Sequence, residues 1–277
     1  MNEKMKKKVE EGLSQVKAFP QVVHNAIKLI DSESADVREI ASVINKEPVL
    51  TARLLSLSNS SFYGFSKRIS SVEHACVILG KHVLKNILIS AAAMECFPAT
   101  ETRRKVWVHS IEVAGVAKLL ADKLNKTSDI IYISGLLHDI GKFLLMDILP
   151  EFYEKYYSEN KQSNEVSIIK ETKEAGVNHA QVGAKIIELW NLPEEIKIMV
   201  EQHHQLPDEN VSVDSKLLCL ANDICHMLED GKPDDEIFKI INECKVEDMF
   251  DGVQNIESML AEIKCEISSL DGVLDKL

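Results

Sequence analysis

The sequence Gly-Leu-Leu-His-Asp-Ile-Gly-Lys, at residues 135–142, places a histidine beside an aspartate in the middle of an apolar segment. The apolar residues around this pair predict one buried helix over about residues 129–147. A buried carboxylate without a cation nearby is costly, so a bound metal would explain why Asp139 stands in such surroundings. The simpler alternative is a structural hydrogen bond between the His138 imidazole and the Asp139 carboxylate.

The rest of the chain is patterned in the same way, with apolar residues at helical spacing and no convincing alternation of period two. Only 11 glycines and 7 prolines occur in 277 residues, which favours helices over many short strands. We therefore predict an all-α helical bundle. The best candidate boundary follows residue 98 and divides the chain into a helical N-terminal subdomain (1–98) and a helical subdomain (99–277) that carries most of the histidines.

Composition excludes several classes of function. The formal net charge of −12 makes a broad basic face for nucleic acid unsuitable, so an RNA-binding or ribonuclease role is only a remote option. We expect no membrane span and no signal peptide, because no run of ~18 apolar residues occurs and the first residues are polar. The six cysteines form no Cys-x-x-Cys pair, which indicates buried thiols of a cytoplasmic protein rather than disulfides or zinc ligands.

Further histidines and one aspartate lie on other predicted helices. They are His109 in Trp-Val-His-Ser, His179 in Asn-His-Ala-Gln, the adjacent His203 and His204, and Asp223 in Ala-Asn-Asp-Ile. Imidazole and carboxylate ligands suit iron, manganese, zinc, nickel or magnesium. One carboxylate can bridge two ions about 3.5–4 Å apart, an arrangement that polarises a phosphoryl group. Side chains from five helices can meet in this way only inside a bundle.

Each of these residues also has a structural alternative. Neighbours on a helix point about 100° apart, so one of His203 and His204 faces away unless the helix frays there. Asp223 could cap a helix or serve as a polar core residue beside Asn222. The Lys142 ammonium could simply be solvated at a helix end.

Motifs in both halves together resemble a known family. The first half contains Glu-Pro-Val-Leu at 47–50 and Ser-Asn-Ser-Ser-Phe-Tyr-Gly at 58–64, and the second half contains His-Asp-Ile-Gly-Lys at 138–142 and Leu-Trp-Asn-Leu-Pro at 189–193. Over about residues 12–228 the chain resembles the HDOD proteins of the HD metal-dependent phosphohydrolase superfamily. That resemblance implies a helical N-terminal half joined to an HD-like half.

The resemblance also implies a set of ligands. By similarity to the HD-GYP branch, one divalent ion would be held by His109, His138, Asp139 and Asp223. Asp139 would bridge to a second ion on His179, His203 and His204, and Lys142 would meet a substrate phosphate. Two departures limit the similarity: no Gly-Tyr-Pro motif follows His204, so cyclic di-GMP hydrolysis is not implied, and Lys105 replaces a glutamate that could serve a third metal.

Two functions therefore follow from the sequence. The first is hydrolysis of a phosphoester or nucleotide, with Asp139 and Lys142 as the catalytic residues. The second is a non-catalytic signal-transduction module whose metal is structural or vestigial and whose partner is a protein. The acidic composition fits a protein partner better than nucleic acid.

Overall fold

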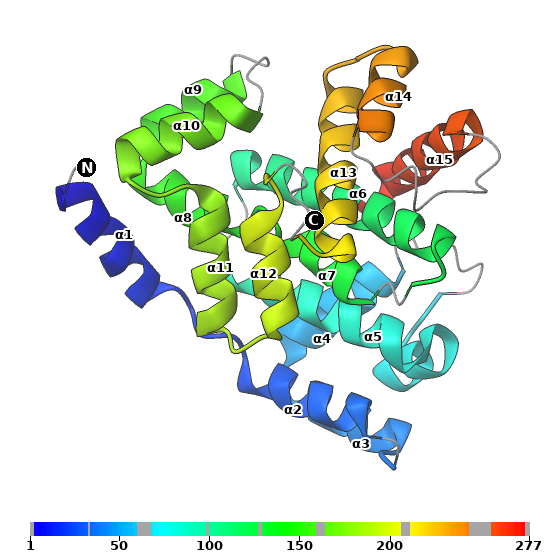
Figure 1. The fold of residues 1–277 in the computed structure, drawn as a ribbon. Coiled ribbons are helices and arrows are strands. Elements are labelled where there is room, and N and C mark those ends of the chain that lie inside the picture. The colour runs from blue at the N-terminus through cyan, green and yellow to red at the C-terminus, as the bar shows by residue number, and fades with distance from the viewer. Residues whose placement is uncertain are drawn as a thin grey trace. The chain divides into compact units, whose positions relative to one another are not determined.

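Figure 1 shows the computed structural model, which describes residues 3–32, 34–59, 68–97, 100–126, 129–158, 164–205, 211–243 and 256–274. All regular elements within these ranges are α-helices, and the predicted all-α class is confirmed. The chain forms two compact units, one of Met1–Val16 with Thr100–Glu266 and one of Lys17–Ala99 with Ile267–Leu277. The first sixteen residues thus group with the second half, which the sequence pattern did not indicate. The boundary at residue 98 stays a prediction.

The smaller unit contains α2 (Gln21–Asp31), α3 (Val37–Ile44), α4 (Pro48–Ser58) and α5 (Val72–Cys96). Pro48 stands in the first turn of α4, where its missing N–H costs nothing. The polar run at 58–64 predicts a loop; Ser58 is the last residue of α4, Asn59 follows the helix, and residues 60–67 lie outside the described ranges. The Asn59 amide donates to the Ile69 carbonyl and accepts from the Ile69 N–H, both at 2.8 Å. This pair closes the loop.

Among the described helices, only α5 is long and apolar enough to cross a membrane by length and composition. Of its most apolar window, 56% is buried in the fold, as in the core helix of a globular unit. Gly80 interrupts the helix with a φ of 78°, a backbone conformation that favours glycine. The remaining segment 81–96 is shorter than the roughly 20 residues that a span requires.

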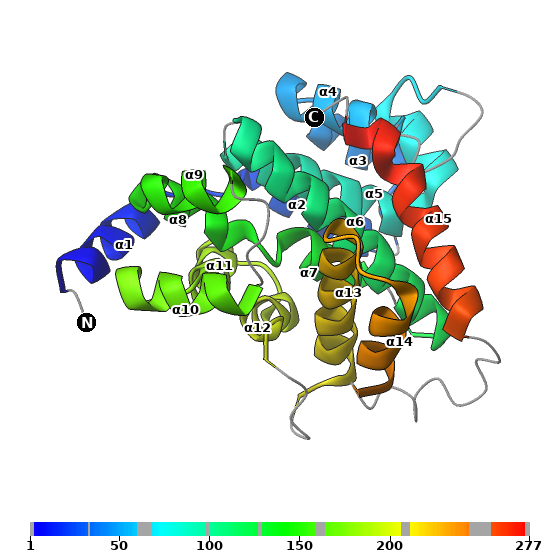
Figure 2. The same cartoon turned by 90° about the horizontal axis from the view of Figure 1, so that it is seen from above.

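The larger unit holds the candidate site. Besides α1 (Glu3–Gln15) and part of α15 (Ile256–Leu274), it contains α6 (Glu101–Lys123), α7 (Asp129–Leu137), α8 (Ile140–Ile148), α9 (Pro150–Ser158), α10 (Asn164–Ala175), α11 (His179–Leu189), α12 (Glu194–Gln202), α13 (Val213–Glu229) and α14 (Asp234–Glu243). Helices α7 and α13 both pack on α6, while α11 packs on α8 and α12 (Figures 1 and 2). These six helices form the bundle that brings distant histidines together.

The helix predicted over 129–147 is divided, which corrects the sequence interpretation. α7 ends at Leu137 and α8 begins at Ile140, so His138 and Asp139 occupy the break between them. The start of α8 lies directly on α11: a Cβ on Gly141 would collide with the His179 backbone and lie 2.6 Å from the Gly183 nitrogen. Only glycine permits this approach, and the turn at 138–139 directs the chain into it.

Candidate metal centre

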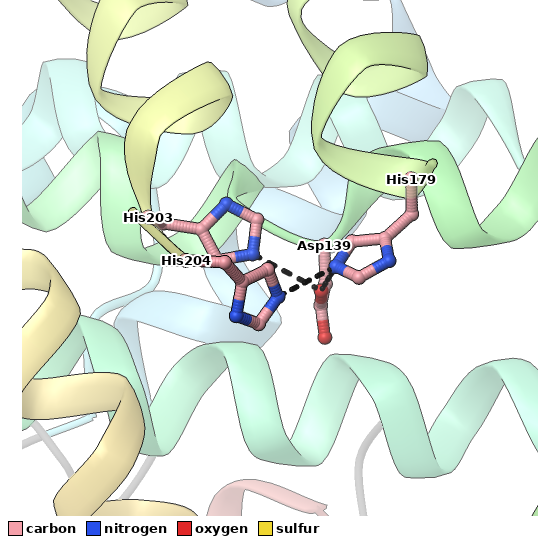
Figure 3. Close-up of side chains that lie close together, drawn as sticks. All are labelled: Asp139, His179, His203 and His204. Atoms are coloured by element: carbon pink, nitrogen blue, oxygen red, sulfur yellow. Dashed lines mark hydrogen bonds and ion pairs between the residues drawn. The ribbon is translucent and has the colours of Figure 1, made fainter. Parts of the chain in front are cut away.

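Asp139 lies at the centre of a group of buried imidazoles. It immediately precedes α8, a position where aspartate usually caps the helix, but its side chain makes no capping hydrogen bond. Its Oδ1 lies 3.3 Å from His179 Nε2 and 3.7 Å from His203 Nε2, and its Oδ2 lies 3.4 Å from His138 Nε2. Figure 3 shows Asp139 with His179, His203 and His204 around it. The carboxylate is only 1% exposed, so these imidazoles replace water as its surroundings.

The imidazoles are oriented through their outer nitrogens. His138 Nδ1 donates to the Gly135 carbonyl and His203 Nδ1 to the Val200 carbonyl, both at 2.6 Å. A carbonyl can only accept, so each neutral ring carries its proton on Nδ1 and presents a lone pair on Nε2. Burial favours these neutral rings, lowering the pKa of His138 to about 4 and that of His203 below its ordinary value.

The inward-facing atoms lack partners. Among the described residues, His138 Nε2, His203 Nε2 and Asp139 Oδ1 are buried without any hydrogen bond. Buried polar atoms are normally satisfied, and unsatisfied ones call for an explanation such as an ion. Nitrogen lone pairs and a carboxylate oxygen around Asp139, in two groups of candidate ligands, match the ligands of divalent transition metals. The residues present therefore fit a metal.

His179 is held by Glu171, a residue that sequence reasoning missed. Glu171 Oε2 accepts from both the backbone N–H and Nδ1 of His179, at 2.8 and 2.7 Å. Its Oε1 accepts from Tyr153 at 2.7 Å and Ser167 at 2.8 Å. Burial alone would raise the pKa of Glu171, but His179 and these hydrogen bonds lower it to about 2. Carboxylates of this kind orient metal-binding histidines and fix their tautomer.

His203 and His204 both reach the group because α12 ends at Gln202, just before them. His204 Nε2 lies 2.8 Å from His179 Nε2, and the rings of His203 and His204 are 4.0 Å apart. Candidate ligand atoms of Asp139, His179, His203 and His204 all lie within 4.8 Å of one another. Burial also holds the pKa of His204 well below its ordinary value, which keeps the ring neutral.

His109, on α6, lies on the other side of Asp139. It forms a second group of candidate ligands with His138 and Asp139. Its Nε2 lies 3.0 Å from the Asn222 Oδ1 and its Nδ1 lies 2.7 Å from Glu229. The contacts of His109 from α13 are therefore made by Asn222, the residue before the predicted ligand Asp223, and by Glu229 at the end of the helix.

Asp223 is half-buried and belongs to none of the candidate ligand groups within the described residues. Its role as a ligand stays a prediction. A third group joins His109 to His226 and Glu229, two α13 residues that sequence reasoning did not include among the ligands.

Lys142 is buried, with only 2% of its surface exposed. Its ammonium donates to Asp139 Oδ2 at 2.5 Å, so it is not solvated at a helix end. Burial would raise the pKa of Asp139, but His138 and Lys142 hold it well below its usual range. The Asp139 carboxylate is thus charged and already carries one cationic neighbour.

A cavity of about 730 Å³ opens beside the group and reaches Asp139 and Lys142. Its walls also include Lys105, His109, Tyr156 and Tyr157. Ligand pockets for small molecules usually measure about 300–1,000 Å³. A small molecule can therefore reach the carboxylate and the ammonium together.

The HDOD domain family model matches residues 16–206. The chain belongs to the HDOD domain family. The matched span includes every candidate ligand from His109 to His204, and it ends before α13, which supplies Asn222 and Glu229.

One curated protein and two solved structures are similar to this chain. The chain is 26% identical over 209 residues to an uncharacterised protein of Treponema pallidum (strain Nichols), in a match that covers 74% of this chain but 40% of that protein. Its fold is similar to a crystal structure from Shewanella amazonensis SB2B, provisionally described as a phosphohydrolase (TM-score 0.77, 19% identity, 98% of each chain). It is similar too to an HDOD domain protein of unknown function from Geobacter sulfurreducens (TM-score 0.75, 23% identity, 99% and 98% covered). At these identities the two structures show the fold alone.

Proposed function

We propose that this HDOD protein binds divalent metal around Asp139 and hydrolyses a phosphoester or nucleotide. The observation that carries the proposal is the set of buried, unpartnered atoms that face inward: His138 Nε2, His203 Nε2 and Asp139 Oδ1. Ligands of this type, all nitrogen and oxygen, suit iron, manganese, nickel, zinc or magnesium. When bound, such a metal supplies a Lewis acid for a phosphoryl oxygen and a water of lowered pKa.

The chain's own residues supply the rest of the proposed reaction. Asp139 and the imidazoles hold the metal, and Glu171 fixes the orientation of His179. Lys142 presents a positive charge in the lining of the cavity, where it can meet the phosphate of a substrate as a point charge. Asp139 and Lys142 are the proposed catalytic residues.

Asp139→Asn tests this function. We expect the variant to purify without bound metal and without phosphatase activity, because the amide removes the charge at the centre of the group. Elemental analysis gives the metal content, and hydrolysis of p-nitrophenyl and bis-p-nitrophenyl phosphate with Mn²⁺ or Fe²⁺ gives the activity. Asp122→Asn, which changes an exposed aspartate on α6, is the matched control. Wild-type metal content and turnover in Asp139→Asn would refute the assignment.

A second candidate is a signal-transduction module that binds a protein partner and does not turn over a substrate. It is favoured by the surroundings of Asp139 Oδ2 and His109, where an ammonium and a neutral amide contact two of the expected ligands. The same hydrolysis assay separates the two candidates. Bound metal without turnover of either phosphate ester favours the module.

A further inference from the structure

The two oxygens of Asp139 have unlike surroundings. Oδ1 faces His179 and His203 and has no hydrogen-bond partner among the described residues. Oδ2 accepts from the Lys142 ammonium at 2.5 Å, with His138 Nε2 at 3.4 Å. Oδ1 is therefore open to a cation, while Oδ2 already contacts one that belongs to the chain and leaves His138 Nε2 as the one unpartnered ligand atom named on that side.

Lys142 is fixed in this position by the fold. It follows Asp139 by three residues, which places both on the same side of the first turn of α8. Both side chains are almost fully buried, and a buried ammonium is tolerated only beside an anion. A divalent ion on Oδ2 would have to displace the ammonium or stand next to it, and both arrangements are electrostatically unfavourable.

The remaining ligands divide in the same way. The group on the Oδ1 side combines Asp139 with the three imidazoles of His179, His203 and His204. The group on the Oδ2 side has only His109 and His138 besides Asp139. His109 Nε2 contacts the neutral Asn222, while its other ring nitrogen, Nδ1, contacts Glu229, a carboxylate that belongs to a separate group with His226. No second carboxylate offsets the charge of an ion on this side within that group.

We propose that the chain holds one divalent ion, on the Oδ1 side, and that the Lys142 ammonium takes the place of a second. This inference rests on the proposed metal binding, and it replaces the pair of ions expected from the sequence. The cavity is lined by Asp139 and Lys142 but by none of the three imidazoles on the Oδ1 side, so a phosphate there would meet the ammonium. Lys142 and Asn222 are the residues that determine the number of ions.

The test is the stoichiometry of Mn²⁺ binding to metal-free, full-length protein, by titration calorimetry and elemental analysis. We expect one ion per chain in the wild type and in Asn222→Asp, because the ammonium remains. We expect two ions in Lys142→Met with Asn222→Asp, where a neutral side chain of similar length replaces the ammonium and a carboxylate is gained. Lys105→Met, which changes another lysine of the cavity wall, is the matched control and keeps one ion.

Electron paramagnetic resonance provides an independent test of the number of bound Mn²⁺ ions. Two adjacent Mn²⁺ ions show exchange coupling in electron paramagnetic resonance, whereas a single ion does not, so coupling is expected only in the double variant. Two ions in the wild type or in Asn222→Asp overturn the inference, and so does a single ion in a folded double variant. If the double variant fails to fold, the wild type and Asn222→Asp still decide the matter. No bound Mn²⁺ in the wild type refutes the proposed metal binding itself.

Discussion

Glu171→Gln tests whether the carboxylate behind His179 prepares the metal centre. The substitution keeps the size of the side chain but removes its charge. Glu171 is fully buried and accepts four hydrogen bonds, two of them from His179. In the variant the amide group can donate to the hydroxyls of Tyr153 and Ser167, while the remaining oxygen still accepts from His179. The side chain should therefore stay in place with weaker, uncharged hydrogen bonds.

The magnitude follows from the pKa of Glu171, which is lowered from 4.5 to about 2. At 1.36 kcal/mol per pKa unit, this shift sets an upper limit of about 3 kcal/mol for the stability that the charge contributes. A folded-state pKa below the unfolded value stabilises the protein above pH 4.5, and that contribution is lost as the pH falls through the folded-state value of about 2. The difference between wild type and variant should therefore be largest near neutral pH and shrink as the pH falls below 4.5.

Metal affinity should fall as well. Removing the group that orients a ligating histidine typically weakens metal binding by about 10- to 100-fold. Urea unfolding of the metal-free proteins measures the first effect, and Mn²⁺ titration calorimetry measures the second. Glu174→Gln, an exposed change on the same helix, controls for the loss of one negative charge. Wild-type Mn²⁺ affinity in a folded Glu171→Gln protein would refute the orienting role.

Three further outcomes are expected. Gly141→Ala should cost roughly 2–3 kcal/mol in urea unfolding, because its methyl group meets backbone, whereas Gly183→Ala meets the Val200 side chain and should cost less. Iodoacetamide at about pH 8 should label the exposed Cys265 before Cys76 and Cys96 by mass spectrometry, since burial raises the pKa of both thiols to about 11; equal rates would contradict this. Asn59→Ala should lower the unfolding free energy by about 1–3 kcal/mol by leaving the Ile69 backbone groups unpaired, and an unchanged midpoint would show that water replaces them.

Local patterns predicted the helices well. Apolar residues recur at helical spacing through the segment 213–229, and α13 spans Val213–Glu229. The break at His138 and Asp139 is not evident from the sequence, because apolar residues continue on both sides of it and neither Gly135 nor Gly141 lies in the break itself. The break depends on the contact of Gly141 with α11, and such tertiary contacts override local preference. Periodicity identifies a helix but not the neighbour that ends it.

The residues that orient the ligand histidines also could not be predicted from the sequence. Glu171 precedes His179 by eight residues and belongs to a different helix, α10, so no fixed spacing relates the two. An acidic residue in a helix is most often exposed. Glu171 is buried instead, and it accepts hydrogen bonds from the hydroxyls of Tyr153 and Ser167 as well as from His179. Motifs were enough to propose the ligand histidines. The groups that accept hydrogen bonds from their Nδ1 atoms, such as the Glu171 carboxylate, are recognised only in the folded structure.

Spacing along the chain does not determine which of two neighbouring side chains faces the interior. Since helical neighbours point about 100° apart, either Asn222 or Asp223 could have faced the interior, and the packing of α13 on α6 decides for Asn222. The same rule would have separated His203 from His204 had α12 continued through them. At the candidate ligand atoms themselves, a neutral amide contacts His109 Nε2 and an ammonium contacts Asp139 Oδ2, in place of the carboxylate that the motifs indicated. That difference, rather than the number of histidines, should set how many ions bind.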